Sequence, residues 1–179
     1  MKLRIVLLLS LVVVIVLLVL GVLRVPSITE RRLAAAYAQL DDAMRRKDLP
    51  AYMALLTPDY SETRFRGKPA SRHEAEKRYR QLMTDWTFGL QDADILRFTE
   101  QKDRVVAIVD RHSEGTVIDS RGAFGPKGKV HRIVSSTTDV DTWVRTPRGL
   151  RLKLRQTGLG TVSVDGKALG MPIVAPHDH

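Results

Sequence analysis

The feature that most constrains this chain is an apolar run near its start, from Ile5 to Leu23, interrupted only by Ser10 and Gly21. In helical form these roughly 19 residues extend for about 28 Å, nearly the thickness of the hydrocarbon core of a bilayer. A helix that is apolar on every side has no face for water, which argues against a buried helix of a soluble protein. We therefore expect residues 5–23 to enter a membrane.

The flanks of this run predict its orientation. Lys2 and Arg4 precede it, and a basic start favours retention of that end in the cytoplasm. A cleavable signal peptide has a shorter apolar stretch, of about 7–15 residues, followed by small residues at the cut. Residues 1–26 are therefore expected to be an uncleaved signal anchor that holds a single-pass protein with its domain outside the cytoplasm. The alternative is a secreted or periplasmic domain released by cleavage.

The rest of the chain has room for one domain, which we assign to residues 27–167, followed by a flexible tail over 168–179. Cysteine is absent, which excludes disulfides, thiolate zinc sites and a cysteine nucleophile. The formal net charge is +9, but the basic residues are scattered over separate predicted elements. This pattern favours a solvated basic surface beside an anionic membrane over a nucleic-acid site.

Two capping boxes mark helix starts, Ser27 with Glu30 and Ser71 with Glu74. They predict helices over 28–47 and 71–84, and Asp48 predicts a short helix over 49–56 between them. The remaining β-branched stretches predict a short strand over 59–65 and four long strands over 88–99, 104–120, 130–145 and 150–164. Helices followed by a run of hairpins indicate an α+β domain, an antiparallel sheet with its helices on one face.

Three stretches carry a resemblance to a known superfamily. They are Met44–Leu49 followed by Ala51–Tyr60, then Asp141–Val144 before Arg148-Gly149, and finally Leu150–Gln156. In this order they resemble the nuclear-transport-factor-2-like superfamily, in particular its polyketide-cyclase-like (SnoaL-like) and ketosteroid-isomerase-like branch. The resemblance covers about residues 30 to 165. Leu150 departs from it, since the branch often has tryptophan directly after the hairpin glycine.

The resemblance implies a cone-shaped, curved antiparallel sheet with about three helices on its concave face, around a pocket. It implies frequent dimers through the sheet. It implies no particular activity, because isomerases, dehydratases, hydrolases and non-catalytic binding or assembly modules share this cone.

The turns predict which strand residues lie opposite one another. A turn at Pro147-Arg148 pairs Arg145 with Leu150, and period-two alternation then sets the pairs further along. These are Trp143 with Leu152, Asp141 with Leu154, and Asp139 with Gln156. The next hairpin places Arg111 beside Asp139 and Val109 beside Asp141.

On this register, a predicted pocket is lined by Trp143, Arg111, Asp139, Asp141 and Gln156, with Tyr37 and Tyr60 able to face it. Asp139 or Asp141 is then a candidate catalytic carboxylate, with a tyrosine or Arg111 beside a developing oxyanion. The alternative is structural: Arg111 and Asp139 form an ion pair, and Asp141 is hydrogen-bonded near a strand end. His73, His112 and His131 are expected near the surface. No metal site or cofactor is predicted.

The outer face of the sheet carries Val130, Val134, Val140 and Val144, which predicts a homodimer surface. The first functional hypothesis is a membrane-anchored, extracytoplasmic domain that binds a small apolar ligand or serves assembly as a scaffold, with no catalysis required. The alternative is a small isomerase, dehydratase or cyclase that uses a buried aspartate in the cone pocket.

Overall fold

The computed structural model describes residues 26–63 and 67–169. The predicted membrane segment at 5–23 lies outside these ranges, as does the predicted tail beyond residue 169. Within the described ranges, no helix combines the length and the apolarity that crossing a membrane requires. The chain divides into two units, Met1–Arg31 and Arg32–His179, and the second contains the sheet.

The helices begin where the capping residues predict. They are α2 (Ile28–Arg45), α3 (Leu49–Ala54) and α4 (Arg72–Asp85). In both capping boxes the serine Oγ accepts the backbone N–H of the glutamate, Glu30 or Glu74, and the glutamate accepts the serine N–H. Asp48 caps α3 by accepting the Ala51 N–H at 3.0 Å. These local signals fix the helix starts without tertiary help.

The strands form one mixed sheet. They are β1 (Leu56–Thr63), β2 (Pro69–Ser71), β3 (Trp86–Glu100), β4 (Arg104–Ile118), β5 (Val130–Thr146), β6 (Gly149–Val164) and β7 (Lys167–Leu169). Their order is β2-β1-β6-β5-β4-β3, with β7 paired to β6. The long antiparallel meander β3–β6 confirms the four predicted strands. Ala168 and Leu169, at the start of the predicted tail, belong to β7.

The expectation of a purely antiparallel sheet is wrong, because β1 pairs with β6 in parallel. Only strands joined by a tight hairpin are forced to run antiparallel. Between β1 and β6 lie α4 and three other long strands, so no turn fixes their relative direction. This parallel pairing places β1 beside the stretch of β6 from Leu152 to Gln156.

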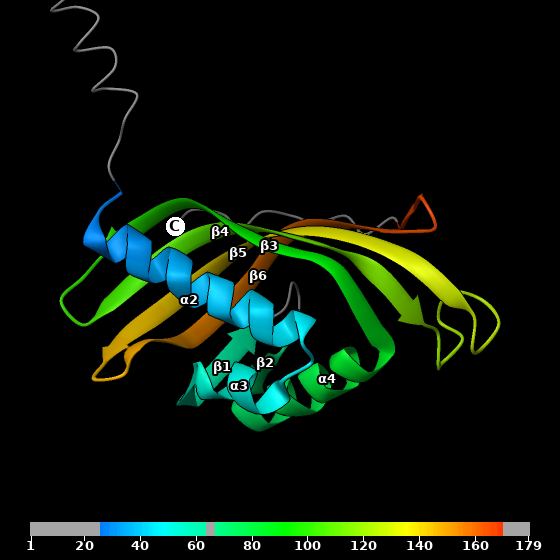
Figure 1. Ribbon diagram of the computed structural model, residues 1–179, viewed down its shortest axis with the longest axis horizontal. Helices are drawn as coiled ribbons and strands as arrows, with labels where there is room; N and C mark the ends of the chain where they lie inside the picture. Colours follow the sequence, from blue (N-terminus) through cyan, green and yellow to red (C-terminus); the bar gives the residue numbers. More distant parts are fainter. Residues whose placement is uncertain (1–25, 64–66, 170–179) are drawn as a thin grey trace, which may run out of the picture. The chain divides into compact units, whose positions relative to one another are not determined.

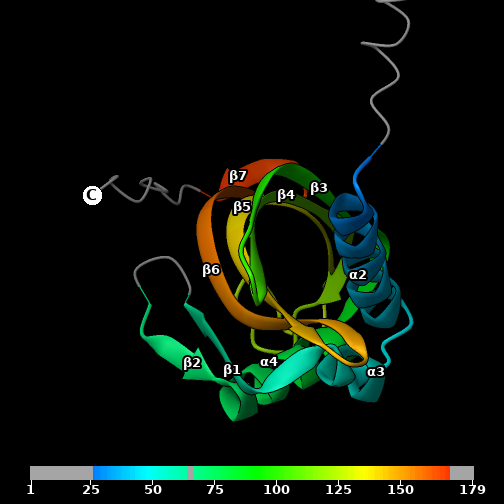
Figure 2. The ribbon, with the colours of Figure 1, turned by 90° about the vertical axis from the view of Figure 1, so that its left-hand side faces the viewer.

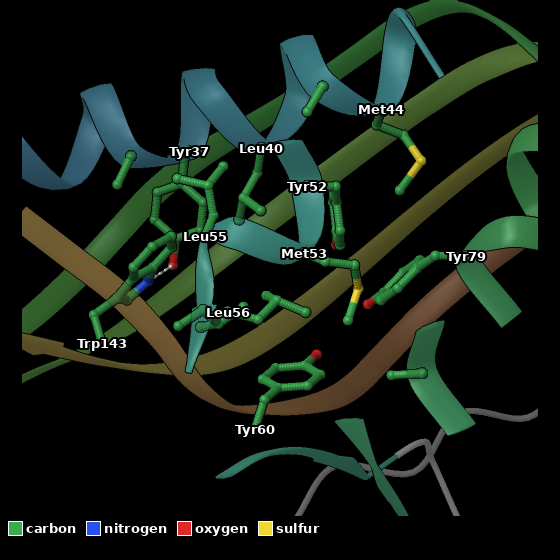
Figure 3. Close-up of a cluster of buried hydrophobic side chains, with 14 of the residues drawn as sticks. Tyr37, Leu40, Met44, Tyr52, Met53, Leu55, Leu56, Tyr60, Tyr79 and Trp143 are labelled. Carbon is green, nitrogen blue, oxygen red and sulfur yellow. Dashed lines mark hydrogen bonds between the residues drawn. The ribbon is translucent and has the colours of Figure 1, made fainter. Parts of the chain in front are cut away.

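The long strands arch over the three helices of the domain (Figure 1), and the end-on view shows β3 to β6 curving strongly (Figure 2). The core lies between the inner face of the sheet and the helices, where all of its members are buried. It includes Leu33, Tyr37 and Leu40 from α2, Tyr52 and Met53 from α3, Ala75, Tyr79 and Met83 from α4, and Val105, Ala107, Val109, Trp143 and Leu152 from the sheet. Figure 3 shows part of this cluster.

The predicted β5–β6 register holds near the turn and fails beyond it. Arg145 pairs with Leu150 and Trp143 with Leu152, as predicted, but Thr142 then pairs with Leu154. The register shift places one extra residue in β6, a β-bulge at Lys153. Asp141 therefore lies opposite Arg155 rather than Leu154, and Asp139 lies opposite Thr157 rather than Gln156.

The bulge reverses which side chains of β6 face the core. Arg155 is buried, whereas Gln156 is exposed, so the prediction that Gln156 faces the pocket is wrong. Alternation has a period of two, and one inserted residue exchanges the two faces. The bulge places the Arg155 guanidinium beside the buried carboxylate of Asp141, a charge that needs cationic partners.

The β4–β5 register differs from the prediction by two residues. Arg111 pairs with Thr137, and Val109 pairs with Asp139. A shift of two keeps every side chain on its predicted face. Arg111 and Asp139 are therefore diagonal neighbours on the inner face rather than direct partners.

Candidate functional site

Asp141 is the most fully buried polar group of the inner sheet face, with an exposed fraction of 0%. The Arg155 guanidinium donates from Nε to Oδ1 and from Nη2 to Oδ2, both at 3.0 Å. Arg111 Nη2 donates to Oδ2 at 3.1 Å. Burial works to raise the pKa of Asp141, but the two guanidiniums outweigh it, so this pKa lies below its usual range. Asp141 is an ionised, fully bonded anchor.

Tyr37 and Trp143 complete the surroundings of Asp141. The Tyr37 hydroxyl donates to Asp141 Oδ2 at 3.2 Å. It accepts the Trp143 Nε1–H at 2.9 Å (Figure 3). The two rings meet edge to face, with centroids 5.0 Å apart. Burial, followed by the charge of Asp141, raises the pKa of Tyr37. This tyrosine is therefore a neutral hydrogen-bond relay between α2 and β5.

Asp139 lies two residues earlier on the same face and is bonded differently. Its Oδ2 lies 3.0 Å from Arg111 Nε and 3.7 Å from Arg155 Nε. Its Oδ1 is buried and has no hydrogen-bond partner among the described residues. Burial raises the pKa of Asp139, although both arginines and a hydrogen bond with the Thr157 side chain act to lower it. The predicted Arg111–Asp139 ion pair is thus confirmed, and Asp139 keeps one oxygen without a partner.

A cavity of about 220 Å³ opens beside Asp139. Its charged lining consists of Asp41, Glu62, Arg78, Arg111, Asp139 and Arg155. Hydroxyl groups come from Ser113, Ser135, Thr137 and Thr157, and aromatic walls from Tyr52, Tyr79, Trp86 and Phe88. Polar groups that converge within aromatic and apolar walls are the usual form of a small-molecule site.

A second charged cluster lies at Glu62, on β1. Tyr60 and Tyr79 donate their hydroxyls to Glu62 Oε2, at 3.0 and 2.9 Å, and Arg78 is ion-paired with Oε1. Burial opposes ionisation of Glu62, but the bond and charge of Arg78 and the tyrosine bonds keep its pKa low. Glu62 and Arg78 therefore balance each other's charge.

No protein-family model matches the sequence, and a search of curated proteins finds no match. Solved structures do match. A candidate dehydratase of the nuclear-transport-factor-2-like family from Streptomyces avermitilis aligns with a TM-score of 0.55 and 16% identity, over 74% of this chain and 97% of that one. A ketosteroid isomerase-like protein from Erwinia carotovora atroseptica aligns with a TM-score of 0.52 and 17% identity, over 69% and 89%. This chain has the nuclear-transport-factor-2-like fold.

A third structure with this fold is a candidate calcium/calmodulin-dependent kinase II association domain from Exiguobacterium sibiricum. It aligns with a TM-score of 0.57 and 11% identity, over 83% of this chain and 98% of that one. Identities this low carry the fold and no activity. The resemblance seen in the sequence is confirmed at the level of the nuclear-transport-factor-2-like fold.

Within this fold, the predicted site residues separate into four groups. Arg111 and Asp139 line the cavity. Tyr37, Asp141 and Trp143 form the bonded cluster in the core, and Tyr60 is bonded to Glu62. Gln156 lies on the outer face. The structure thus brings together two of the seven predicted residues as cavity lining.

Other residues that line the cavity were not predicted, although the sequence pattern around some of them could have indicated a buried polar group. Asp41 lies on the apolar stripe of α2, between Tyr37 and Met44, where a carboxylate is unusual. Glu62 follows Tyr60 by two residues on β1, so both side chains lie on the buried face of this strand. Arg155 had no such signal, because the bulge changes its face.

His131 is a further correction, because it is buried rather than near the surface. Its Nδ1 lies 2.7 Å from Asp165 Oδ2, and its ring meets the Phe124 ring in an edge-to-face contact. Among the residues that the structure describes, no group of three acidic, histidine or cysteine side chains is arranged to hold a metal ion.

Proposed function

We propose that this chain is a small-ligand-binding domain whose site is the cavity beside Asp139, and that its N-terminal run holds it at the outer side of a membrane. One observation carries the binding proposal: the Asp139 side chain lines a cavity, and one of its two carboxylate oxygens is buried without a hydrogen-bond partner among the described residues. A buried polar atom without a partner is costly, and a bound ligand group removes that cost. No catalytic step is required.

The size of the cavity limits the ligand. About 220 Å³ corresponds to roughly seven water molecules at about 30 Å³ each. This is below the roughly 300–1,000 Å³ of drug-sized sites. The ligand, or the part of it that enters, is therefore about one substituted ring in size.

The binding proposal is tested by filling the cavity. Ser135 lines it, while Ser136 is the next residue of β5 and faces the opposite side of the sheet. A panel of small one-ring compounds is screened by thermal shift against wild type, Ser135→Leu and Ser136→Leu. We expect hits that stabilise wild type and Ser136→Leu and lose their effect in Ser135→Leu. Hits that are indifferent to Ser135→Leu, or a panel without hits, would contradict this site.

The enzyme alternative rests on the same oxygen. Asp139 lines the cavity and has a raised pKa, its Oδ1 has no hydrogen-bond partner among the described residues, and Arg111 Nε lies 3.0 Å from its other oxygen. Such a carboxylate is suited to accept a proton from a bound ketone. The structurally similar dehydratase and isomerase-like proteins make this chemistry worth testing. Asp139-dependent exchange of ketone α-protons in D₂O, followed by NMR, is the measurement.

The membrane proposal rests on the run Ile5–Leu23 behind Lys2 and Arg4. The full chain is expected in the membrane fraction and to resist alkaline extraction, whereas a chain starting at residue 26 is expected in the soluble fraction. A full-length chain found soluble and shortened would instead support cleavage of the leader.

An assembly role remains the other form of this proposal, through a homodimer formed by the outer sheet face. Val134, Val140 and Val144 are only half-buried there. Val140→Arg is expected to give a folded monomer. A wild-type domain that light scattering finds monomeric at high concentration would contradict the dimer.

A further inference from the structure

We infer that the ligand of this cavity is a small organic ammonium, a protonated amine on an aromatic or otherwise apolar body, whose N–H binds the carboxylate of Asp139. This inference rests on the proposed binding function and specifies its ligand class. Three observations carry it: an excess of carboxylates, the position of the unpartnered atom, and the aromatic composition of the wall.

The ionisable groups around Arg111 do not balance. Arg111 lies within 4 Å of three carboxylates, with Nη1 at 3.6 Å from Asp41, Nε at 3.0 Å from Asp139 and Nη2 at 3.1 Å from Asp141. Arg155 is the second cation of this group. When all three carboxylates are ionised, they exceed the two guanidiniums by one negative charge, and burial raises the pKa of the two that bear it least easily, Asp41 and Asp139. Glu62 does not alter this difference, because Arg78 pairs with it.

Asp139 and Asp41 are the two carboxylates of this group that the arginines compensate least. Asp141 uses both oxygens in bonds to Arg155, Arg111 and Tyr37. Asp139 is 2% exposed, shares its Oδ2 with the arginines, and has no partner for Oδ1. Since both Asp139 and Asp41 line the cavity, the missing positive charge belongs inside it.

The walls suit a cation as well. Two aromatic pairs line the cavity: Tyr52 with Tyr79, at a centroid distance of 4.5 Å, and Trp86 with Phe88, at 5.3 Å. Aromatic faces attract cations, and ammonium ligands are commonly held between aromatic rings. The Arg78 guanidinium already lies 4.8 Å from the centre of the Tyr79 ring.

An anionic ligand fits these groups poorly. Each guanidinium nitrogen of Arg155 already faces Asp141 or the Tyr52 hydroxyl, and Arg111 is shared among three carboxylates. An incoming carboxylate or phosphate would meet the carboxylate of Asp139 without a free cation to compensate it. A neutral alcohol offers the hydrogen bond but not the charge.

Three probes of matched shape separate these classes: benzylamine, benzyl alcohol and benzoate. Binding to the folded domain is measured at neutral pH by calorimetry or NMR titration. We expect benzylamine to bind about tenfold more tightly than benzyl alcohol, because its hydrogen bond is charge-assisted, and benzoate to bind most weakly. Asp139→Asn is expected to abolish the preference for benzylamine. Asp110→Asn, which removes a carboxylate on the outer face of β4, is expected to preserve it.

The outcomes are distinguishable. Equal affinities for the three probes, a preference for benzoate, or a benzylamine preference that survives Asp139→Asn would overturn the ammonium inference and leave the binding site standing. The same holds if no probe binds while other compounds stabilise wild type and not Ser135→Leu. If Ser135→Leu changes the response to no compound at all, the binding function itself fails.

Discussion

Asp139 and Asp141 lie two residues apart on the same face of β5, yet they have opposite surroundings. Asp141 is enclosed by Arg155, Arg111 and the Tyr37 hydroxyl, and its pKa is lowered. Asp139 forms ion pairs with the same two arginines through its Oδ2 alone, and burial raises its pKa. The difference teaches that burial alone does not define a functional carboxylate. The number of donors that reach each oxygen decides whether it anchors the fold or remains available to a ligand.

Removing the charge of Asp141 should have the largest effect. Asp141→Asn leaves two buried guanidiniums short of a counter-charge, and we expect a loss of about 3–5 kcal/mol in the free energy of unfolding. Urea denaturation at neutral pH measures this loss. An unchanged midpoint would mean that Asp141 is no more an anchor than Asp139.

Arg155→Met should lower the free energy of unfolding by about 3 kcal/mol. This loss is somewhat smaller than that for Asp141→Asn, because Arg111 and Tyr37 still bond Asp141. The matched control is Gln156→Met on the exposed side of the same strand, expected within about 0.5 kcal/mol. Equal losses for the two variants would show that the bulge at Lys153 is absent in solution.

Lowering the pH should remove the contribution of Asp141 to the free energy of unfolding. A folded-state pKa below the unfolded value of about 3.9 gives stability that is complete above that value and is lost as pH falls through the folded pKa. The difference between wild type and Asp141→Asn should therefore shrink below about pH 4. A difference that stays constant down to strongly acidic pH would contradict an ionised Asp141.

Asp139→Asn should have the smallest effect, within about 1 kcal/mol of wild type at neutral pH. Ionising Asp139 in the fold costs free energy, because its pKa is raised, and asparagine avoids that cost while Arg111 keeps Asp141 and Asp41. The sign follows: relative to wild type, the variant should gain stability as pH rises through the folded pKa of Asp139. A large loss at neutral pH would make Asp139 a second anchor and remove the basis for a ligand there.

The sequence by itself determined the helix starts, the four long strands and the inner face of β5. Ser27 with Glu30 and Ser71 with Glu74 satisfy backbone donors three residues away, and such contacts depend on no distant part of the chain. Alternation along β5 likewise places Asp139, Asp141 and Trp143 on one side wherever the strand docks. The predicted ion pair of Arg111 with Asp139 was correct although the predicted register was wrong by two residues, because a shift of two keeps both side chains on the same face.

Only the tertiary structure decided which charges meet. One extra residue at Lys153 turns Arg155 inward and Gln156 outward, and no local sequence pattern marks that position. The result is visible only across two strands, where Arg155 of β6 reaches the buried Asp141 of β5. The parallel pairing of β1 with β6 likewise depends on packing of the whole sheet, since no turn joins them. Local hydrogen bonds can be inferred from spacing, whereas the compensation of a buried charge depends on groups distant in the sequence.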